Sequence, residues 1–299
     1  MRRVGLVRMD VLSEPDPDEA PLLRALRDAG IDARTIVWTR ASEPEHDPAN
    51  YHACILRATW DYYKRPAEFV RWIQRAATVT HLVNSPHDVL WNMHKSYILE
   101  LQARGVPVVP TALVRQGEIQ DLRGAESALA RTGWPSFIIK PAVSAGSWMT
   151  TRHEEVIGAA ETLVSRTRER DMLVQPIIPE FAEPPKRAPS GGEWGGEVCV
   201  VSINSRITHA VRKRPRYAGE DESVSAADVT DAHRALARSA LDASATRPMY
   251  ARIDMVERRD GSLLLSELEL IEPSLFFDYS DAALEQMVLA VRAPLHAAR

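Results

Sequence analysis

The stretches Ala251-Arg252-Ile253-Asp254 and Ser266-Glu267-Leu268-Glu269-Leu270 alternate charged and apolar residues on either side of a turn sequence at 258–261. Side chains two apart on a β-strand point to the same face of that strand. If the two stretches pair as an antiparallel hairpin, one face of the hairpin gathers an arginine and three carboxylates. These side chains are Arg252, Asp254, Glu267 and Glu269.

Three carboxylates on one face repel one another, and a metal ion would relieve that repulsion. Mg²⁺ prefers oxygen ligands and usually takes one or two carboxylates together with phosphate oxygens. An arginine beside such an ion can contact a phosphoryl group during its transfer. The competing interpretation is a half-buried strand pair with a solvated charged face, which is common in antiparallel sheets. The alternation by itself favours the two interpretations about equally.

The segment before residue 90 alternates strand-like and helix-like patterns. Strands are expected at 4–7, 33–38, 52–57 and 80–83, with helices at 20–29 and 67–77. Acidic residues ahead of the first helix suit its N-terminus, and Gly30 suits its end. This alternation predicts a mostly parallel, doubly wound sheet with helices on both faces.

The pattern changes between residues 83 and 137, after which antiparallel hairpins are expected. A long helix is expected to run from Ser85, its capping residue, to residue 103. Later strands are expected at 137–140, 172–175, 197–203, 207–211, 249–256 and 262–270, and later helices at 154–168, 227–243 and 280–291. We interpret the Pro- and Gly-rich segment 176–196 as a surface loop and the polar segment 214–225 as mobile. This part of the chain therefore has α+β character.

The composition excludes several classes of protein. The chain has 299 residues, 45% of them hydrophobic and 26% charged, with a formal net charge of −4. The length suggests about two domains, and the lack of basic excess argues against a nucleic-acid partner. Cys54 and Cys199 lie in apolar runs, which favours buried free thiols in a reducing cytoplasm. No signal peptide is expected at Met1, and no apolar window approaches the ~20 residues of a membrane span.

Two lysines and a loop of small residues are candidate phosphate ligands. Lys140 ends an apolar strand and precedes the loop Pro141-Ala-Val-Ser-Ala-Gly-Ser147. A lysine can hold a phosphate as a point charge, and small residues let backbone N–H groups approach phosphate oxygens. Lys95 lies in the expected long helix. Taken alone, each lysine is more often an ordinary solvated charge.

Taken in chain order, these elements resemble the ATP-grasp superfamily and its glutathione-synthetase-like branch. A helix lysine is followed by a strand lysine with its loop, a hinge strand at 173–180 and a Gly-Glu strand start at 196–197. A basic strand end at 209–213 and the Arg-x-Asp and Glu-x-Glu pair complete the order. The resemblance implies an ATP-grasp fold, in which an α/β doubly wound parallel-sheet domain precedes two α+β subdomains that clasp ATP. The corresponding domains are 1–90, 91–175 and 176–299.

The resemblance also implies roles for individual residues. The nucleotide would be held by Lys95, Lys140, Ser144, Ala145, Gly146, Ser147, Gln175, Ile177 and Ile178, with Glu180 and Glu197 as alternatives for the ribose. Two Mg²⁺ ions, or Mn²⁺ in their place, would be bound by Asp254, Glu267 and Glu269. Arg252 and Lys213 would stabilise the transferred phosphoryl group and an acyl phosphate. The sequence departs from the common family pattern at Glu269, where many members have Asn.

A small amino-acid substrate is expected beyond the strand at 52–57, because ligands of open α/β sheets bind beyond the carboxyl ends of strands. Arg57 would hold its carboxylate and Asp61 its ammonium group. The other candidates are Arg8, Asp10, Thr59 and Trp60. The alternative is that the aromatic residues here simply pack a domain interface, and the two interpretations weigh about equally.

At the level of the whole chain, the sequence is similar to the O-ureido-D-serine cyclo-ligases of D-cycloserine biosynthesis. This resemblance implies that ATP phosphorylates the serine carboxylate and that the oxyamine nitrogen of the same molecule closes the ring. No enzymic nucleophile is then required, in keeping with the absence of a Ser/His/Asp or Cys/His signature in the sequence. Three alternatives stay open: an intermolecular carboxylate–amine ligase, a nucleotide-binding module without catalysis, and a scaffold. The sequence leaves open whether the chain forms a homo-oligomer.

Overall fold

A parallel sheet forms the N-terminal part of the chain. The computed structural model describes residues 2–183, 186–187, 193–214, 223–244 and 246–297. The sheet has the order β2-β1-β3-β4, and all its pairs are parallel. Its strands are β1 (Arg3–Arg8), β2 (Asp32–Val37), β3 (Ala53–Ala58) and β4 (His81–Val83). Every residue of β3 is buried, as expected of a central strand covered on both faces.

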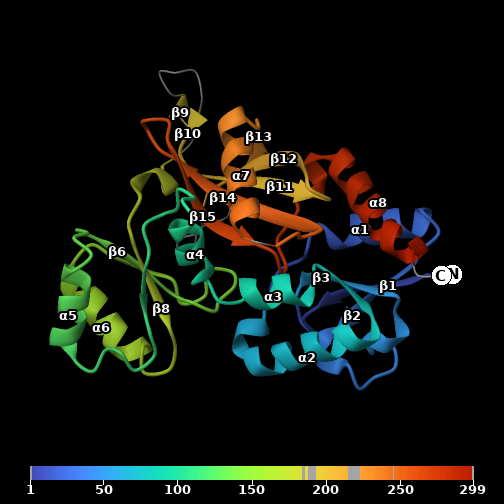
Figure 1. The fold of residues 1–299 in the computed structure, drawn as a ribbon, viewed down its shortest axis with the longest axis horizontal. Coiled ribbons are helices and arrows are strands. Elements are labelled where there is room, and N and C mark those ends of the chain that lie inside the picture. Colours follow the sequence, from blue (N-terminus) through green and yellow to red (C-terminus); the bar gives the residue numbers. More distant parts are fainter. Residues whose placement is uncertain (1, 184–185, 188–192, 215–222, 245, 298–299) are drawn as a thin grey trace.

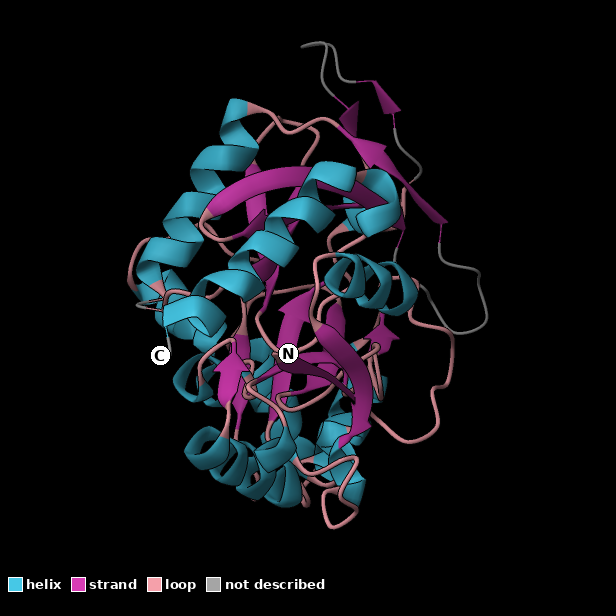
Figure 2. Cartoon of the chain, turned by 90° about the vertical axis from the view of Figure 1, so that its right-hand side faces the viewer, coloured by secondary structure: helices cyan, strands magenta, loops and turns pink. Residues whose placement is uncertain are grey.

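Helices cover both faces of this sheet (Figures 1 and 2). On one face Leu6 packs with Leu22 of α1 (Glu19–Asp28) and with Met287 of α8 (Asp281–Ala297). On the other face Leu56 packs with Phe69 and Ile73 of α2 (Pro66–Val79). The doubly wound arrangement is confirmed. The return of the C-terminal helix α8 to the N-terminal sheet could not be read from local patterns.

An antiparallel sheet, ordered β5-β8-β6-β7, forms the lobe at the left of Figure 1. Its strands are β5 (Ala112–Val114), β6 (Phe137–Pro141), β7 (Thr151–His153) and β8 (Met172–Pro176). Helices α5 (Leu122–Ala130) and α6 (Val156–Arg166) pack on it. The sequence predicted β6, β8 and α6 but not the other three elements. β5 and β7 are three residues long, too short for a periodic signal.

The third sheet has the order β13-β12-β11-β14-β15, with antiparallel pairs throughout. Its strands are β11 (Glu197–Ile203), β12 (Arg206–Arg214), β13 (Ser223–Ala227), β14 (Tyr250–Glu257) and β15 (Leu263–Glu269). Both expected hairpins are confirmed, and Asn204 and Ser205 turn the first with φ of 51° and 63°. Helix α7 (Asp231–Ala243) follows β13 and packs against β15.

The expected mobile segment 214–225 is wrong at its two described ends. Arg214 ends β12, and residues 223–225 belong to β13, where Ser225 pairs with Arg212. An edge strand with polar residues carries no apolar alternation, so its sequence does not show it. Residues 215–222 lie outside the described part. The strand also displaces the start of α7 to Asp231, four residues later than expected.

The expected long helix at 85–103 is wrong, because the structure divides it into α3 (Pro86–Asn92) and α4 (Tyr97–Ala103). Ser85 caps α3 in a capping box with Asp88. Lys95 therefore lies in the turn between two helices. Its backbone N–H donates to Ala142 O at 2.7 Å, so tertiary contacts replace helical hydrogen bonds at this point.

The segment 176–196 is a loop with short regular pieces where it is described. It contains the 3₁₀ turn η4 (Pro179–Phe181) and the two-residue strands β9 (Lys186–Arg187) and β10 (Glu193–Trp194). Residues 184–185 and 188–192 of this predicted loop lie outside the described residues. Gly196 has φ of +70°, and a Cβ there would lie 2.9 Å from Lys213 O, so glycine is required next to β12.

Two polar side chains join the N-terminal sheet to the five-stranded sheet. Asn84 Nδ2 donates to Tyr250 O at 2.8 Å and to Leu270 O at 2.7 Å. The Tyr250 hydroxyl lies 2.8 Å from Leu56 O and 2.9 Å from Ile271 O. The division at residues 90 and 175 stays a prediction. Among the helices described, none combines the length and apolarity needed to cross a membrane.

Candidate active site

The predicted charged patch forms on β14 and β15, the last two strands of the five-stranded sheet. In the β14–β15 pair, Arg252 lies opposite Glu269 and Asp254 lies opposite Glu267. Hydrogen-bonded partners in an antiparallel pair point to the same face. The predicted convergence of these four side chains is therefore confirmed as geometry, because the hairpin register is the one that the alternation required.

Arg252 is held by two carboxylates. Its Nε lies 2.8 Å from Asp254 Oδ1, and its Nη2 lies 2.8 Å from Asp254 Oδ2. The same Nη2 donates to Glu269 Oε1 at 2.5 Å. This fork geometry fixes a buried guanidinium on the face where the carboxylates gather. A phosphoryl group that approached this face would meet a preoriented positive charge.

The charges of both predicted lysines act on Glu267. The Lys95 Nζ forms an ion pair with Glu267 Oε1. Burial alone would raise the pKa of Glu267, but the charges of Lys95 and Lys140 lower it below its ordinary value. Burial, together with the like charge of Lys95, lowers the pKa of Lys140. The two lysines thus act on the same glutamate, although Lys95 lies in the turn between α3 and α4 and Lys140 lies on β6.

Lys213 also lies near Asp254. Its Nζ is 3.4 Å from Glu197 Oε2 and 4.0 Å from Asp254 Oδ2. Glu197 also accepts a hydrogen bond of 2.6 Å from Ser266 Oγ. Arg252 and Lys213, the predicted pair, therefore both lie near Asp254, and their role in phosphoryl transfer stays a prediction.

Cys199 belongs to the same face, which the sequence analysis missed. It was interpreted only as a thiol in an apolar run, yet it lies two residues after Glu197 on β11 and opposite Asp254. Possible ligand atoms of Glu197, Cys199 and Asp254 lie within 4.8 Å of one another. Burial and then Asp254 raise the pKa of this thiol well above its ordinary value, so it stays protonated and unreactive.

The cations of the site do not fully compensate Glu269. Burial raises the pKa of Glu269, and although Arg252 opposes this, Asp254 and Glu267 raise it further. Such a carboxylate gains from a cation in its vicinity. Oxygen donors from Asp254, Glu267 and Glu269 suit a hard divalent ion, so the side chains present fit Mg²⁺.

The small-residue loop rests against the N-terminal sheet. Tyr62 donates its hydroxyl to Ser144 O at 3.3 Å, and the ring of Tyr63 packs on Trp148 with centroids 4.6 Å apart. Gly146 and Ser147 both have positive φ, of 58° and 57°. A serine held in this conformation is strained, which is common where a backbone must approach a ligand.

The residues predicted to meet the adenine lie at the end of β8 and just after it, and their role stays a prediction. Gln175, near the end of β8, donates from Nε2 to Thr111 Oγ1 at 2.8 Å, and the backbone of Ile177 and Ile178 leads into η4. Glu180 is buried, and its carbonyl accepts the N–H of Gly196 at 2.8 Å. Because Gly196 precedes Glu197, this bond brings the two candidates for the ribose near each other, and the choice between them stays open.

The candidate substrate residues have different surroundings. Asp10 pairs with Arg40 at 2.7 Å on the surface, and Arg8 lies 3.6 Å from Glu19. Asp61 accepts hydrogen bonds from Trp38 Nε1 at 2.8 Å and Arg65 Nη2 at 3.4 Å. Trp60 Nε1 donates to Glu272 O at 3.4 Å, and the Thr59 hydroxyl is buried without a partner among the described residues. Their assignment to the substrate stays a prediction.

Arg57 is occupied by a buried ion pair. It is 2% exposed, and its Nη2 lies 2.9 Å from Asp18 Oδ2, with Asp18 itself 1% exposed. Asp18 also accepts the backbone N–H groups of Leu275 at 2.5 Å and Phe277 at 2.9 Å. The pair thus ties the loop after β15 to the N-terminal sheet. Asp18 was missed from sequence, since nothing local distinguishes it from other acidic residues near a helix start.

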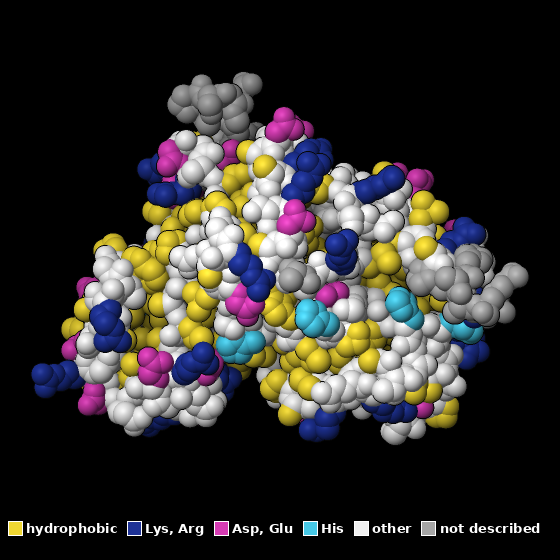
Figure 3. Space-filling model, in the orientation of Figure 1, with side chains coloured by type: hydrophobic (Ala, Val, Ile, Leu, Met, Phe, Trp, Pro, Cys, Tyr) yellow, Lys and Arg dark blue, Asp and Glu magenta, His cyan; other side chains and the backbone are white. Residues whose placement is uncertain are grey.

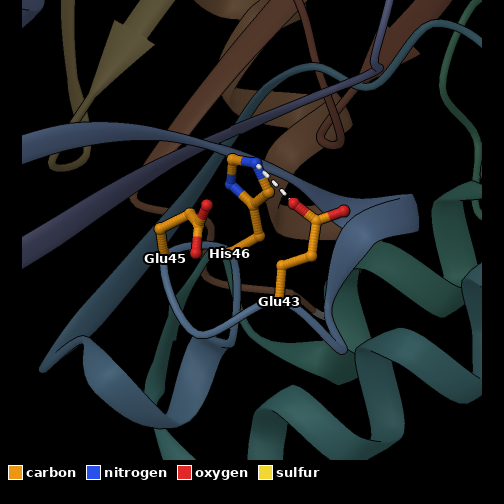
Figure 4. Close-up of side chains that lie close together, drawn as sticks. All are labelled: Glu43, Glu45 and His46. Carbon is orange, nitrogen blue, oxygen red and sulfur yellow. Dashed lines mark ion pairs between the residues drawn. The ribbon is translucent and has the colours of Figure 1, made fainter.

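A second group of possible metal ligands, Glu43, Glu45 and His46, lies on a loop of the N-terminal part (Figure 4). Both glutamates are exposed, and His46 Nδ1 accepts the N–H of Val37 at 3.4 Å. The histidine therefore has a structural partner, and exposed carboxylates of this kind are common without an ion.

Figure 3 shows a notch between the lobe of α5 and α6 and the N-terminal lobe, with charges of both signs interspersed over this face.

A known family matches the N-terminal part of the chain. Residues 4–84 match the family model described as the N-terminal domain of the D-cycloserine synthetase DcsG. The cycloserine biosynthesis protein DcsG of Streptomyces lavendulae is 29% identical over 289 residues, covering 91% of this chain and 92% of that protein. The sequence similarity thus extends well beyond the N-terminal domain.

Solved structures agree with the fold. The crystal structure of the D-cycloserine synthetase DcsG superposes with a TM-score of 0.82 at 28% identity, covering 97% of this chain and 99% of that one. The D-alanine–D-alanine ligase of Bacillus anthracis, complexed with ATP, has a TM-score of 0.66 at 15% identity, covering 99% of this chain and 100% of that one. At that identity the second similarity shows the ATP-grasp fold alone.

Proposed function

Because this chain is an ATP-dependent ligase with the ATP-grasp fold and resembles D-cycloserine synthetase, we propose that it activates the carboxylate of an amino acid as an acyl phosphate and closes a ring. The proposed substrate is O-ureido-D-serine and the proposed product is D-cycloserine. ADP and phosphate would be the other products of ATP, and the carbamoyl group would leave, with uptake of water, as CO₂ and ammonia.

One observation carries the proposal. Arg252 and Lys213 both lie near Asp254, Lys95 pairs with Glu267 and the charge of Lys140 acts on Glu267, so several cations act on the carboxylates of one partly buried face. A transferred phosphoryl group spreads negative charge over its oxygens. Preoriented cations in a site shielded from water stabilise that charge more strongly than solvent does. This face therefore supports phosphoryl transfer better than a scaffold role.

We assign Mg²⁺ binding to the three carboxylates. Asp254, Glu267 and Glu269 would hold two ions, with Mn²⁺ as an alternative. When bound, the ions would neutralise the charge of the ATP phosphates and orient them. Lys95 is paired with Glu267 in the ligand-free protein. It would turn from Glu267 to a phosphate oxygen when the nucleotide enters.

The ring closure needs positioning more than chemical catalysis from the protein. The attacking nitrogen and the activated carboxyl group belong to one substrate molecule. Once the site holds that molecule in a folded conformation, the effective molarity of the nitrogen is high. The described cysteines, Cys54 and Cys199, are both buried. The buried, protonated Cys199 is unsuited to covalent catalysis, which agrees with direct attack by the substrate nitrogen.

The test is ADP release with Mg²⁺-ATP and O-ureido-D-serine, with and without a second amino acid. We expect ADP and ammonia in equal amounts without any acceptor. ADP that appears only when an amine is added would instead establish an intermolecular ligase. ATP binding without ADP release under either condition would leave a nucleotide-binding module and contradict the proposal.

A further inference from the structure

A fourth carboxyl group lies beside the proposed metal ligands but has no role in the ATP chemistry described above. Glu272 follows β15 by three residues and is 9% exposed. Its Oε2 is buried and has no hydrogen-bond partner among the described residues. A buried carboxyl oxygen without a partner opposes folding, so its presence calls for an occupant.

Glu272 lies between the N-terminal sheet and the face that carries Asp254, Glu267 and Glu269, which we call the metal face. Its backbone carbonyl accepts the Trp60 Nε1 hydrogen at 3.4 Å, which places it at the end of β3. The charges of Glu269 and Lys95 both act on its carboxyl group, so Glu272 also lies near the metal face. Thr59, the residue before Trp60, is 0% exposed, and its hydroxyl is also without a partner in the described structure.

We infer that Glu272 binds the α-ammonium group of the amino acid whose carboxylate is phosphorylated, with the Thr59 hydroxyl contributing to the same subsite. This inference rests on the proposed function, since it takes the activated substrate to be an amino acid. In an α-amino acid, the ammonium group and the carboxylate are bonded to the same carbon atom. The group that binds the ammonium must therefore lie close to the site of phosphoryl transfer, as Glu272 does.

The structure favours an ammonium group over a third metal ion. Mg²⁺ usually keeps several water ligands, which a closed, buried oxygen does not accommodate. An ammonium group has three hydrogen-bond donors and no such requirement, so it can be enclosed by a carboxylate and a hydroxyl. Charge-assisted bonds of this kind are stronger than neutral ones.

Glu272 is also a better acceptor than Asp61, the residue that the sequence suggested for this role. Both oxygens of Asp61 accept hydrogen bonds within the N-terminal sheet domain, from Trp38 and Arg65. Asp61 would have to lose those contacts to reach a substrate, whereas Glu272 has an oxygen that no described residue contacts by a hydrogen bond. The structure thus moves the ammonium subsite from the strand end at β3 to the loop after β15.

The experiment compares two variants with two substrates. Glu272→Gln keeps the shape of the side chain and removes its charge, and Glu272→Asp keeps the charge on a shorter side chain. The substrates are O-ureido-D-serine and its twin without the amino group, 3-(ureidooxy)propanoate. ADP release is measured with each, and the exposed Glu285→Gln variant in α8 serves as the control.

We expect Glu272→Gln to lower kcat/KM for the amino acid by about 10- to 100-fold, the range of a lost charge-assisted hydrogen bond. Activity with the twin should change less than about twofold, because the twin has no ammonium group to lose. Glu272→Asp should recover part of the loss. Equal losses with both substrates, or an increased Mg²⁺ requirement in Glu272→Gln, would overturn the inference.

A parallel pair of substrates separates failure of this inference from failure of the proposed function. D-Alanine and propanoate are assayed in the same way. Turnover of D-alanine without turnover of O-ureido-D-serine would reject the cyclo-ligase function, and the effect of Glu272→Gln would then be read from this pair. If the wild-type enzyme does not prefer an amino acid over its twin in either pair, Glu272 has no ammonium to bind and the inference is wrong.

Discussion

At the scale of single residues, neighbouring charges set the behaviour of each carboxyl group. Glu267 has a lowered pKa because Lys95 and Lys140 outweigh the effect of its burial. Glu269 and Glu272 have raised pKa values, first because they are buried and then because other carboxylates lie near them. Three glutamates within six positions of the chain thus differ in charge near neutral pH. Their different surroundings, not their sequence spacing, decide this.

Glu267→Gln should abolish turnover and leave the fold intact. The amide keeps an oxygen but loses the charge that pairs with Lys95 and would bind Mg²⁺. We expect ADP release to fall at least about a hundredfold, the size of effect that loss of one electrostatic contact in an active site produces. Circular dichroism melting checks the fold, with Glu285→Gln as the surface control. A near-wild-type rate would show that the metal assignment is wrong.

The ligand-free protein should lose stability as the pH rises from about 5 to 8. Burial and then Glu269 raise the pKa of Glu272 to about 8, above its ordinary value of 4.5. In that interval the folded state binds more protons than the unfolded state, so the free energy of unfolding falls with increasing pH. Urea unfolding measures this, and Glu272→Gln should flatten the slope. Equal slopes in the two proteins would contradict the raised pKa.

At the scale of elements, a break between two helices places the first phosphate lysine. Asn92, the last residue of α3, donates from Nδ2 to Leu268 O at 2.7 Å and accepts the N–H of Leu270 at 2.9 Å. These bonds fasten the helix end to β15. The turn that follows then carries Lys95 to Glu267 and to the loop after β6.

Asn92→Ala should destabilise the protein by about 2–4 kcal/mol, because two buried backbone groups lose their partners. The KM for ATP should also rise, since the turn with Lys95 loses its anchor. Urea unfolding and ADP release measure the two effects. Gln102→Ala, at an exposed position of α4, is the control and should change neither. Unchanged stability in Asn92→Ala would mean that the helix break does not depend on this clamp.

At the scale of the whole molecule, one buried ion pair links the N-terminal sheet to the loop behind the metal face. Arg57 on β3 pairs with Asp18, which accepts the N–H groups of Leu275 and Phe277. Phe276 between them has φ of 52°, and its ring lies 5.8 Å from the Arg252 guanidinium carbon. The pair thus holds in place a strained loop that contacts a residue of the proposed catalytic face.

Arg57→Met should destabilise the protein by about 3–5 kcal/mol, because Asp18 would be left buried without its cation. Adding Asp18→Asn should recover part of that loss. Arg75→Met, which breaks the surface pair with Asp47, should cost about 1 kcal/mol or less. Chemical denaturation of the variants measures these differences. If Arg57→Met cost no more than Arg75→Met, the buried pair would not be the joint described here.

Much of the candidate site could be predicted because its parts carry local signals. The alternation at 251–254 and 266–270 indicated the face of each strand, and the hairpin register brought the four charges together as expected. The strand with Lys140 and the loop after it were also predicted. By contrast, Glu272 and Asp18 have no periodic pattern around them. Only their burial and their distant partners distinguish them from surface carboxylates.

The sequence by itself determined the elements whose apolar spacing repeats over enough residues: the parallel sheet with its helices, and the two hairpins of the third sheet. The side-chain period of two along a strand was sufficient to place charges on one face. The tertiary structure alone decided the break at Lys95, the return of α8 to the N-terminal sheet and the burial of Arg57 and Glu272. Those features depend on contacts between residues far apart in the chain, such as Asp18 with Leu275, for which a local pattern contains no information.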